Sequence, residues 1–321
     1  MPAAETAQPL SELIRPDTWL AQAWASAQQH HGVYIGRFAP SPSGRLHQGS
    51  LIAALASYLH AHWHGGTWLV RMEDVDQSRC THAIGAHQLA TLRALGFESD
   101  EPVLWQTERF AAYRTAFEQL RVHRRVYPCA CTRKQIAEQQ AQLGVVHYPR
   151  TCRNGMANSV VNDAAIRSWR FDVGDEIITW TDESGSINTE RLSETSGDFV
   201  IRRGAQDTDD WAYQLAVVVD DAAQGVTHVV RGADLFGSTA RQIALQRALG
   251  YPAPQYSHVP LLTNVHGEKL SKSEQAPELD ALNPLAALQH AWQFLGGKYF
   301  WCENIVDFWL NTKKIYYPTG C

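Results

Sequence analysis

The sequence is poor in cysteine and carries no excess of positive charge. Six cysteines in 321 residues are too few for a disulfide-stapled secreted domain, so we expect a reduced, cytoplasmic protein. Lysine and arginine number 28 against 33 acidic residues, and the formal net charge is −5. This balance excludes a histone-like or polybasic nucleic-acid binder, so any RNA contact must use local basic patches.

Long apolar runs are absent as well. The richest apolar stretch, Leu51 to Leu59, is followed by the polar residues His60, His62 and His64 and is too short to span a bilayer. Residues 1–30 lack both the basic region and the continuous apolar region of a signal peptide. We therefore expect no membrane partner.

Two common phosphate-binding fingerprints are also missing. The sequence contains no G-x-x-x-x-G-K-[ST] segment and no G-x-G-x-x-G segment after an expected strand. A Walker-type nucleotidase and a dinucleotide-binding protein are thereby excluded.

What the sequence does contain is an alternation of short apolar strands with helical segments, which predicts an α/β protein with a parallel sheet. Strands are expected at 33–38 and 67–72, and valine-rich runs at 215–219 and 226–230 read as strands buried on both faces. Helices are expected at 19–27, 81–95, 108–124, 239–249 and 285–295.

The alternation is interrupted once, which predicts a split catalytic domain. Short alternating strands are expected between Ile166 and Arg203, as in an insertion built from hairpins. We predict an N-terminal extension at 1–32, a catalytic domain at 33–125 and 204–262, an insertion at 126–203, and a lysine loop with a C-terminal helical region at 263–321.

Two segments at opposite ends of the expected sheet carry phosphate chemistry. In the first, Gly44 and Gly49 allow a close approach of the backbone, and His47 stands at the mouth of a helix whose free N–H groups favour an anion. The second presents Lys269 and Lys272, mobile point charges suited to a phosphate whose charge grows during reaction. Together they predict a triphosphate site without a Walker lysine.

These two segments resemble the HIGH and KMSKS signatures of class I aminoacyl-tRNA synthetases, in the form used by the glutamyl/glutaminyl branch. Further agreement comes from 70–76, 213–221 and 227–235, so the resemblance runs from about residue 33 to Ser273. The 48 residues after Ser273 are too few for the anticodon-binding region of a full-length glutamyl enzyme, so the chain is most similar to the truncated glutamyl-queuosine tRNA(Asp) synthetases. Ser50 and Gln48 depart from the first signature, which leaves phosphate stabilisation there to His47, backbone amides and the serine.

The resemblance implies activation of L-glutamate by Mg-ATP as glutamyl-adenylate, then transfer of glutamate to queuosine in the anticodon loop of tRNA(Asp). It implies His47 and Lys272 as catalytic residues, and His47, Gly49, Lys269 and Lys272 as ATP-binding residues. It implies a glutamate site made of Arg37, Phe38, Ala39, Pro40, Ser41, Glu73, Tyr213 and Arg231. The charges agree, because glutamate brings two carboxylates and one ammonium into a partly dry pocket that must supply arginine and an acid.

A cysteine cluster in the insertion predicts one structural zinc ion. Cys129, Cys131 and Cys152 with one harder donor can close a tetrahedral site, and free buried thiols are the alternative. From the residues alone His147 is the better fourth ligand, because imidazole is the commoner zinc donor. The family pattern, C-x-C followed by Y-x-x-x-C, implies Tyr148. The other cysteines have no partners at ligand spacing.

Other functions remain open at this point. A free-standing truncated glutamyl-tRNA synthetase that charges a tRNA 3′ end would use the same pocket. A small-molecule nucleotidyltransferase also uses a His-x-Gly phosphate motif, but it would leave Glu73, Tyr213 and Arg231 without a purpose. We expect a monomer whose partners are ATP, L-glutamate and queuosine-containing tRNA(Asp). Candidate contacts to tRNA phosphates are Arg124, Arg125, Arg150, Arg153, Arg202 and Arg203.

Overall fold

The computed structural model describes residues 10–155, 166–204, 208–262, 279 and 283–313. Five parallel strands lie at its centre: β1 (Ile35–Phe38), β2 (Thr67–Met72), β3 (Leu104–Trp105), β9 (His228–Gly232) and β10 (Gln255–Val259). They form two ladders, β1–β2–β3 and β9–β10. Thr227 joins the ladders, because its N–H donates to Ile35 O at 2.9 Å and its hydroxyl accepts from Ile35 N at 2.9 Å. The predicted α/β class with a parallel sheet is confirmed.

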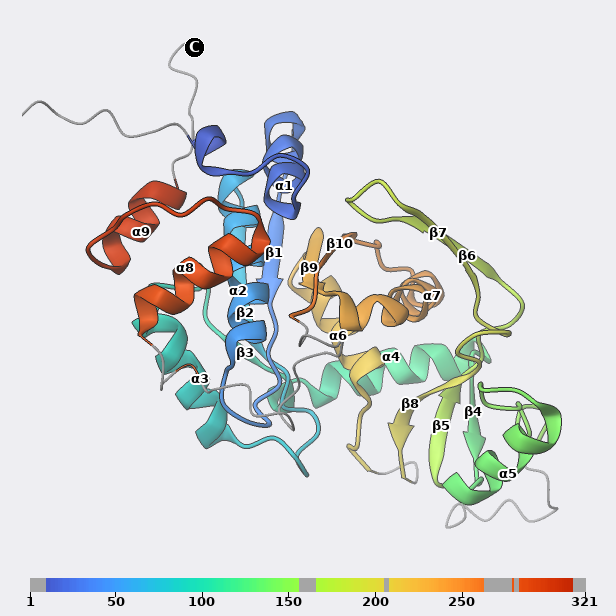
Figure 1. Cartoon of the computed structure of the whole chain (residues 1–321). Coiled ribbons are helices and arrows are strands. Elements are labelled where there is room, and N and C mark those ends of the chain that lie inside the picture. The colour runs from blue at the N-terminus through green and yellow to red at the C-terminus, as the bar shows by residue number, and fades with distance from the viewer. Residues whose placement is uncertain (1–9, 156–165, 205–207, 263–278, 280–282, 314–321) are drawn as a thin grey trace, which may run out of the picture.

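Helices cover both sides of these strands (Figure 1). They are α1 (Trp19–Gln29), α2 (Gln48–Trp63), α3 (His82–Ala94), α4 (Phe110–Val122), α6 (Tyr213–Ala223), α7 (Thr239–Leu249), α8 (Pro284–Leu295) and α9 (Ile305–Thr312). One hydrophobic core joins α1, α2, α8 and α9 to the β1–β2 ladder. A second core joins α4, α6 and α7 to the strands of the insertion. No helix of the described residues is long and apolar enough to cross a membrane.

Antiparallel strands interrupt the parallel sheet, as the sequence predicts. β4 (Val126–Cys129), β5 (Ser168–Phe171) and β8 (Phe199–Arg203) pair in that order. A separate hairpin pairs β6 (Ile177–Thr181) with β7 (Ile187–Arg191) and curves back toward the parallel strands (Figure 1). The exposed helix α5 (Arg133–Leu143) follows β4. The limits of the insertion at 126 and 203 stay a prediction.

One predicted strand is wrong. The valine-rich run at 215–219 lies inside α6, whose residues from Leu215 to Asp221 are all buried. A helix buried on every side shows no amphipathic period, so a short apolar run in it resembles a buried strand. The next expected strand, at 226–230, corresponds to β9, which begins at His228.

Candidate active site

A cavity of about 230 Å³ opens where the parallel strands end. Crevices beside the carboxyl ends of parallel strands are the usual ligand sites of open α/β sheets. Eight of the predicted site residues line this cavity: Arg37, Phe38, Ala39, His47, Gly49, Glu73, Tyr213 and Arg231. Pro40 and Ser41 do not line it, and Lys269 and Lys272 lie outside the described residues.

His47 is the N-cap of α2, and this role favours one tautomer of its neutral ring. Its Nδ1 accepts the backbone N–H groups of Gly49 at 3.1 Å and Ser50 at 3.4 Å. A neutral imidazole that accepts at Nδ1 carries its proton on Nε2, so the ring offers Nε2–H as a donor. The cap therefore places one imidazole donor at the positive end of a sixteen-residue helix, where an anion is favoured.

A buried network of four charges lies on the β1–β2 side of the cavity, and two of its members, Arg37 and Glu73, line the cavity. Asp221 Oδ1 lies 2.8 Å from Arg71 Nη2 and 3.2 Å from Arg37 Nε. The same Arg71 nitrogen lies 3.2 Å from Glu73 Oε1, and Arg71 itself is fully buried. Two cations and two anions balance formally, which buried charges require.

The two acids of this balanced network differ, because the pKa of Asp221 is lowered and that of Glu73 is raised. Burial raises the pKa of Glu73, while Arg71 and Arg37 oppose that rise. Glu73 is also the acid of the network that lines the cavity. An ammonium group bound beside it would stabilise the ionised carboxylate, so the site is suited to a ligand that carries a positive charge.

Arg231 lies in β9 and lines the same cavity, and hydrogen bonds hold its whole guanidinium. Nη1 donates to Gln242 Oε1 at 2.7 Å, and Nη2 donates to Thr239 Oγ1 at 2.8 Å. Nε donates to His258 Nε2 at 3.3 Å, and His258 Nδ1 lies 2.6 Å from Asp182 Oδ2. This chain fixes the orientation of an arginine that faces the cavity, which is the geometry for recognising a carboxylate.

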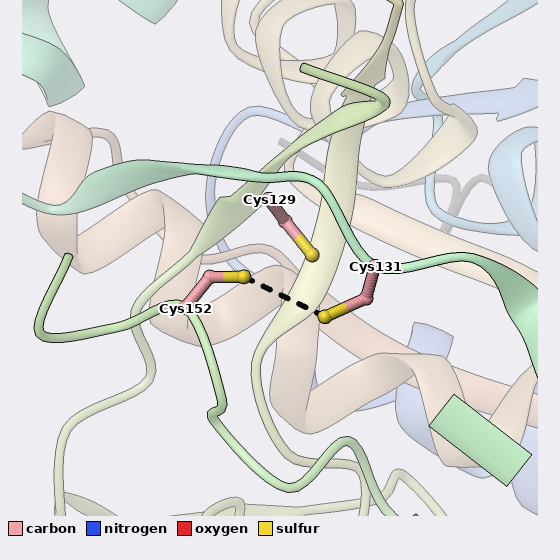
Figure 2. Close-up of side chains that lie close together, drawn as sticks. All are labelled: Cys129, Cys131 and Cys152. Carbon is pink, nitrogen blue, oxygen red and sulfur yellow. Dashed lines mark hydrogen bonds between the residues drawn. The ribbon is translucent and has the colours of Figure 1, made fainter. Parts of the chain in front are cut away.

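A second group of functional side chains lies in the insertion. Cys129 ends β4, Cys131 follows two residues later and Cys152 lies in a loop, and the three sulfur atoms face one another (Figure 2). They lie within 4.8 Å of one another, with Cys131 Sγ 3.5 Å from Cys152 Sγ. The hydroxyl of Tyr148 lies 3.3 Å from Cys129 Sγ and 3.7 Å from Cys131 Sγ.

The chemistry of this donor set fits a soft or borderline cation. Burial raises the pKa of Cys131 to about 12, and burial also raises the pKa of Tyr148. Burial opposes ionisation of Cys129 too, but hydrogen bonds from Tyr148 and Arg170 outweigh it and lower its pKa. A dication at the centre would stabilise all of these donors as anions, as a metal does for coordinated thiols.

Comparison with known proteins decides the family. A model of the catalytic domain of class I tRNA synthetases (E and Q) matches residues 35–281. A glutamyl-Q tRNA(Asp) synthetase of Burkholderia cenocepacia (strain HI2424) is 50% identical over 270 residues, which cover 82% of this chain and 88% of the relative. The chain belongs to this family. The glutamyl-Q tRNA(Asp) synthetase family is a family of ligases, so this protein is an enzyme.

Two further relatives agree with this assignment. A glutamyl-Q tRNA(Asp) synthetase of Cupriavidus metallidurans (strain ATCC 43123 / DSM 2839 / NBRC 102507 / CH34) is 50% identical over 286 residues, covering 87% of this chain and 89% of the relative. The crystal structure of glutamate-tRNA synthetase from Elizabethkingia anophelis superposes with a TM-score of 0.66 at 27% identity, over 76% of this chain. The chain spans about half of that synthetase, because the match covers 53% of it.

The six arginines predicted to contact tRNA phosphates lie in different surroundings. Arg150 lies 3.3 Å from Asp198, and Arg153 donates to Asp172 at 2.9 Å. Arg202 is buried, with its guanidinium over the ring of Trp211. The remaining three differ: Arg203 pairs with Asp210, Arg125 lies over Phe171, and Arg124 is exposed.

The sequence did not reveal the residues that orient the site of this glutamyl-Q tRNA(Asp) synthetase family member. Asp221 belongs to a segment that carries the family resemblance, but its pairing with Arg37 and Arg71 spans more than 140 residues. Asp182 and His258 carried no signal, because they meet only when the β6–β7 hairpin packs beside β10.

Proposed function

We propose that this enzyme activates L-glutamate with Mg-ATP and transfers it to queuosine in the anticodon loop of tRNA(Asp). The observation that carries the proposal is that the acid Glu73 and two arginines, Arg37 and Arg231, line one cavity beside His47, which Asp234 also borders. That charge pattern complements an amino acid with two carboxylates and one ammonium group. The names of two relatives that are 50% identical to this chain support the same substrate and acceptor.

In the proposed complex the ammonium group lies against Glu73, whose ionised form it would stabilise. Arg37, Arg231 and the hydroxyl of Tyr213 surround the carboxylates. The hydrogen bonds that hold the Arg231 guanidinium leave its orientation set before glutamate arrives, so little ordering is needed on binding.

In the proposed first step a glutamate carboxylate oxygen attacks the α-phosphorus of ATP in line, and the bond to pyrophosphate breaks. No protein nucleophile is needed, so positioning and charge stabilisation supply the catalysis. His47 donates from Nε2 and Lys272 neutralises charge on the transferring phosphates. In the second step a hydroxyl of queuosine attacks the glutamyl carbonyl carbon, and AMP leaves.

We also propose that Cys129, Cys131, Tyr148 and Cys152 hold one structural zinc ion. Tyr148 is supported over His147 as fourth ligand, because its hydroxyl lies within 3.7 Å of two of the sulfur atoms. Among the described histidines none joins this group of three cysteines. Zinc would cross-link the end of β4 to the loop that carries Cys152.

Removing a thiolate should remove that zinc. We expect purified protein to hold about one zinc per chain that resists dialysis against a chelator, and the Cys129→Ser and Cys152→Ser variants to lose it. Cys302→Ser is the matched control, because Cys302 lies outside the cluster. Metal analysis of the dialysed proteins checks this. Full zinc retention in either cluster variant would exclude that residue as a ligand.

Replacing the planar guanidinium of Arg231 by an ammonium group should weaken glutamate binding. Arg231→Lys keeps the charge but loses the planar fork, so we expect the KM for glutamate to rise roughly tenfold with a smaller change in kcat. Steady-state ATP–pyrophosphate exchange at varied glutamate measures it. Arg241→Lys is the control, since Arg241 donates to Gly237 O on the neighbouring turn and does not line the cavity. Equal KM values in both variants would contradict the role of Arg231.

The proposed function as a whole is tested by incubating the enzyme with ATP, labelled glutamate and mixed tRNA, and by mapping the nucleotide that carries the label. Label on the queuosine nucleotide supports the proposal. Label on a 3′ adenosine would identify a free-standing glutamyl-tRNA synthetase. ATP turnover that does not depend on glutamate would favour a small-molecule nucleotidyltransferase.

A further inference from the structure

A second group of metal-ligating side chains lies away from both sites described above. His60 and His64 come from the C-terminal turn of α2, and Glu183 comes from the turn between β6 and β7. Their ligand atoms lie within 4.8 Å of one another. His60 Nε2 is 2.7 Å from Glu183 Oε2, and His60 is fully buried. Two imidazoles and one carboxylate thus converge from segments that are far apart in the sequence.

In both histidines Nδ1 has a hydrogen-bond partner of its own. Nε2 is therefore the nitrogen that can face the centre of the cluster. His64 Nδ1 lies 2.7 Å from His60 O, so it carries the proton, and the lone pair of Nε2, which lies 3.4 Å from Ser26 Oγ, is an acceptor. His60 Nδ1 lies 2.7 Å from the hydroxyl of buried Tyr34. Histidines that bind metals nearly always have their other nitrogen held by a carbonyl or similar group in this way.

The surroundings of the three residues are rich in further donors. Glu183 Oε1 is buried without a hydrogen-bond partner among the described residues, while His60, Ser26 and Ser257 lie near the same carboxylate and lower its pKa. His30 Nε2 is buried and equally unsatisfied, and its ring centroid lies 4.9 Å from that of His64. Buried polar atoms normally have partners, so two orphaned atoms beside one cluster call for a ligand.

We propose that His60, His64 and Glu183 bind a divalent transition-metal ion of the zinc class, separate from the cysteine site. Such ions accept imidazole and carboxylate ligands together, and three protein ligands leave one position for water or a fourth donor. Ligand atoms of a tetrahedral zinc ion lie about 3.3 Å apart, so the 2.7 Å contact of His60 and Glu183 must open slightly as the ion replaces the shared proton.

Such an ion would cross-link the turn between β6 and β7 to the C-terminal turn of α2. Glu183 is already tied to β10 through its N–H, which donates to Tyr256 O at 2.9 Å. The same turn carries Asp182, which holds His258 and through it Arg231. The proposed ion therefore stabilises a turn that helps to orient the candidate glutamate site.

Metal counting on tag-free, full-length protein tests the proposal. After Zn²⁺ is added to protein previously dialysed against a chelator, we expect two equivalents per chain by equilibrium dialysis. His64→Gln and Glu183→Gln should each bind only one equivalent, and Cys129→Ser should retain the other. His62→Gln is the matched control, because His62 lies on the same turn of α2 but its Nδ1 contacts Tyr58 O. It should bind two.

Cobalt distinguishes the two sites by their colour. Co²⁺ bound by thiolates shows an intense charge-transfer absorption, whereas Co²⁺ bound by imidazole and carboxylate shows only weak bands. In His64→Gln and Glu183→Gln we expect the intense absorption to remain, which also shows that the variants are folded, while the weak bands of the second ion disappear. One equivalent in the wild type, or a second equivalent that survives both substitutions, would overturn the proposal.

Discussion

tRNA(Asp) that carries queuosine is expected to accept labelled glutamate, and the same tRNA with unmodified guanosine is expected to accept none. The proposed acceptor is a hydroxyl of the cyclopentenediol of queuosine, which guanosine lacks, so the difference should be all or none. Unstacked loop nucleotides offer their edges and hydroxyls to a protein, which makes such a base accessible. Retention of labelled glutamate on purified tRNA measures the result.

The control for this experiment is glutamate-dependent ATP–pyrophosphate exchange measured on the same enzyme preparation. Active exchange with no charging of either tRNA(Asp) form would show that activation is right and the acceptor is wrong. Equal charging of both forms, or charging of the 3′ adenosine of tRNA(Glu), would replace the proposal by a conventional synthetase. The names of two relatives that are 50% identical to this chain support charging of the queuosine form alone.

Replacing His47 by asparagine should reduce ATP–pyrophosphate exchange by roughly 10²-fold while the fold remains intact. His47 has two roles that this substitution separates. Asparagine is among the best N-cap residues, so it can accept the N–H groups of Gly49 and Ser50 as Nδ1 does now. It cannot replace the Nε2–H donor that the imidazole offers to the phosphates.

His47→Ala provides the comparison, because it removes both the cap and the donor. We expect an equal loss of ATP–pyrophosphate exchange in the two variants. Only His47→Ala should also have a lower free energy of unfolding, by about 1 kcal/mol. Near wild-type exchange in His47→Asn would restrict His47 to capping α2.

Lys272→Ala should also reduce ATP–pyrophosphate exchange by about 10²-fold, since the lysine would meet charge that grows in the transition state.

Several elements could be read directly from the residues because their signals are local. The predicted strand at 67–72 and the predicted helix at 239–249 match β2 and α7. The predicted helix at 81–95 corresponds to α3, which begins one residue later because Thr81 is its N-cap. By contrast, α5 escaped prediction because it buries none of its residues and therefore has no apolar stripe.

By itself the sequence determined the α/β class, the glutamyl/glutaminyl branch of the synthetases and eight of the residues that line the cavity. Only the tertiary structure decided how those side chains are held. Arg71 and Asp221 come from different elements, and Asp182 reaches His258 across 76 residues. For the proposed fourth zinc ligand the structure favours Tyr148 over His147, because the hydroxyl of Tyr148 lies beside two thiols. Motifs record local chemistry, whereas partners far apart in the chain are chosen by packing, which brings buried charges together because none can remain unpaired.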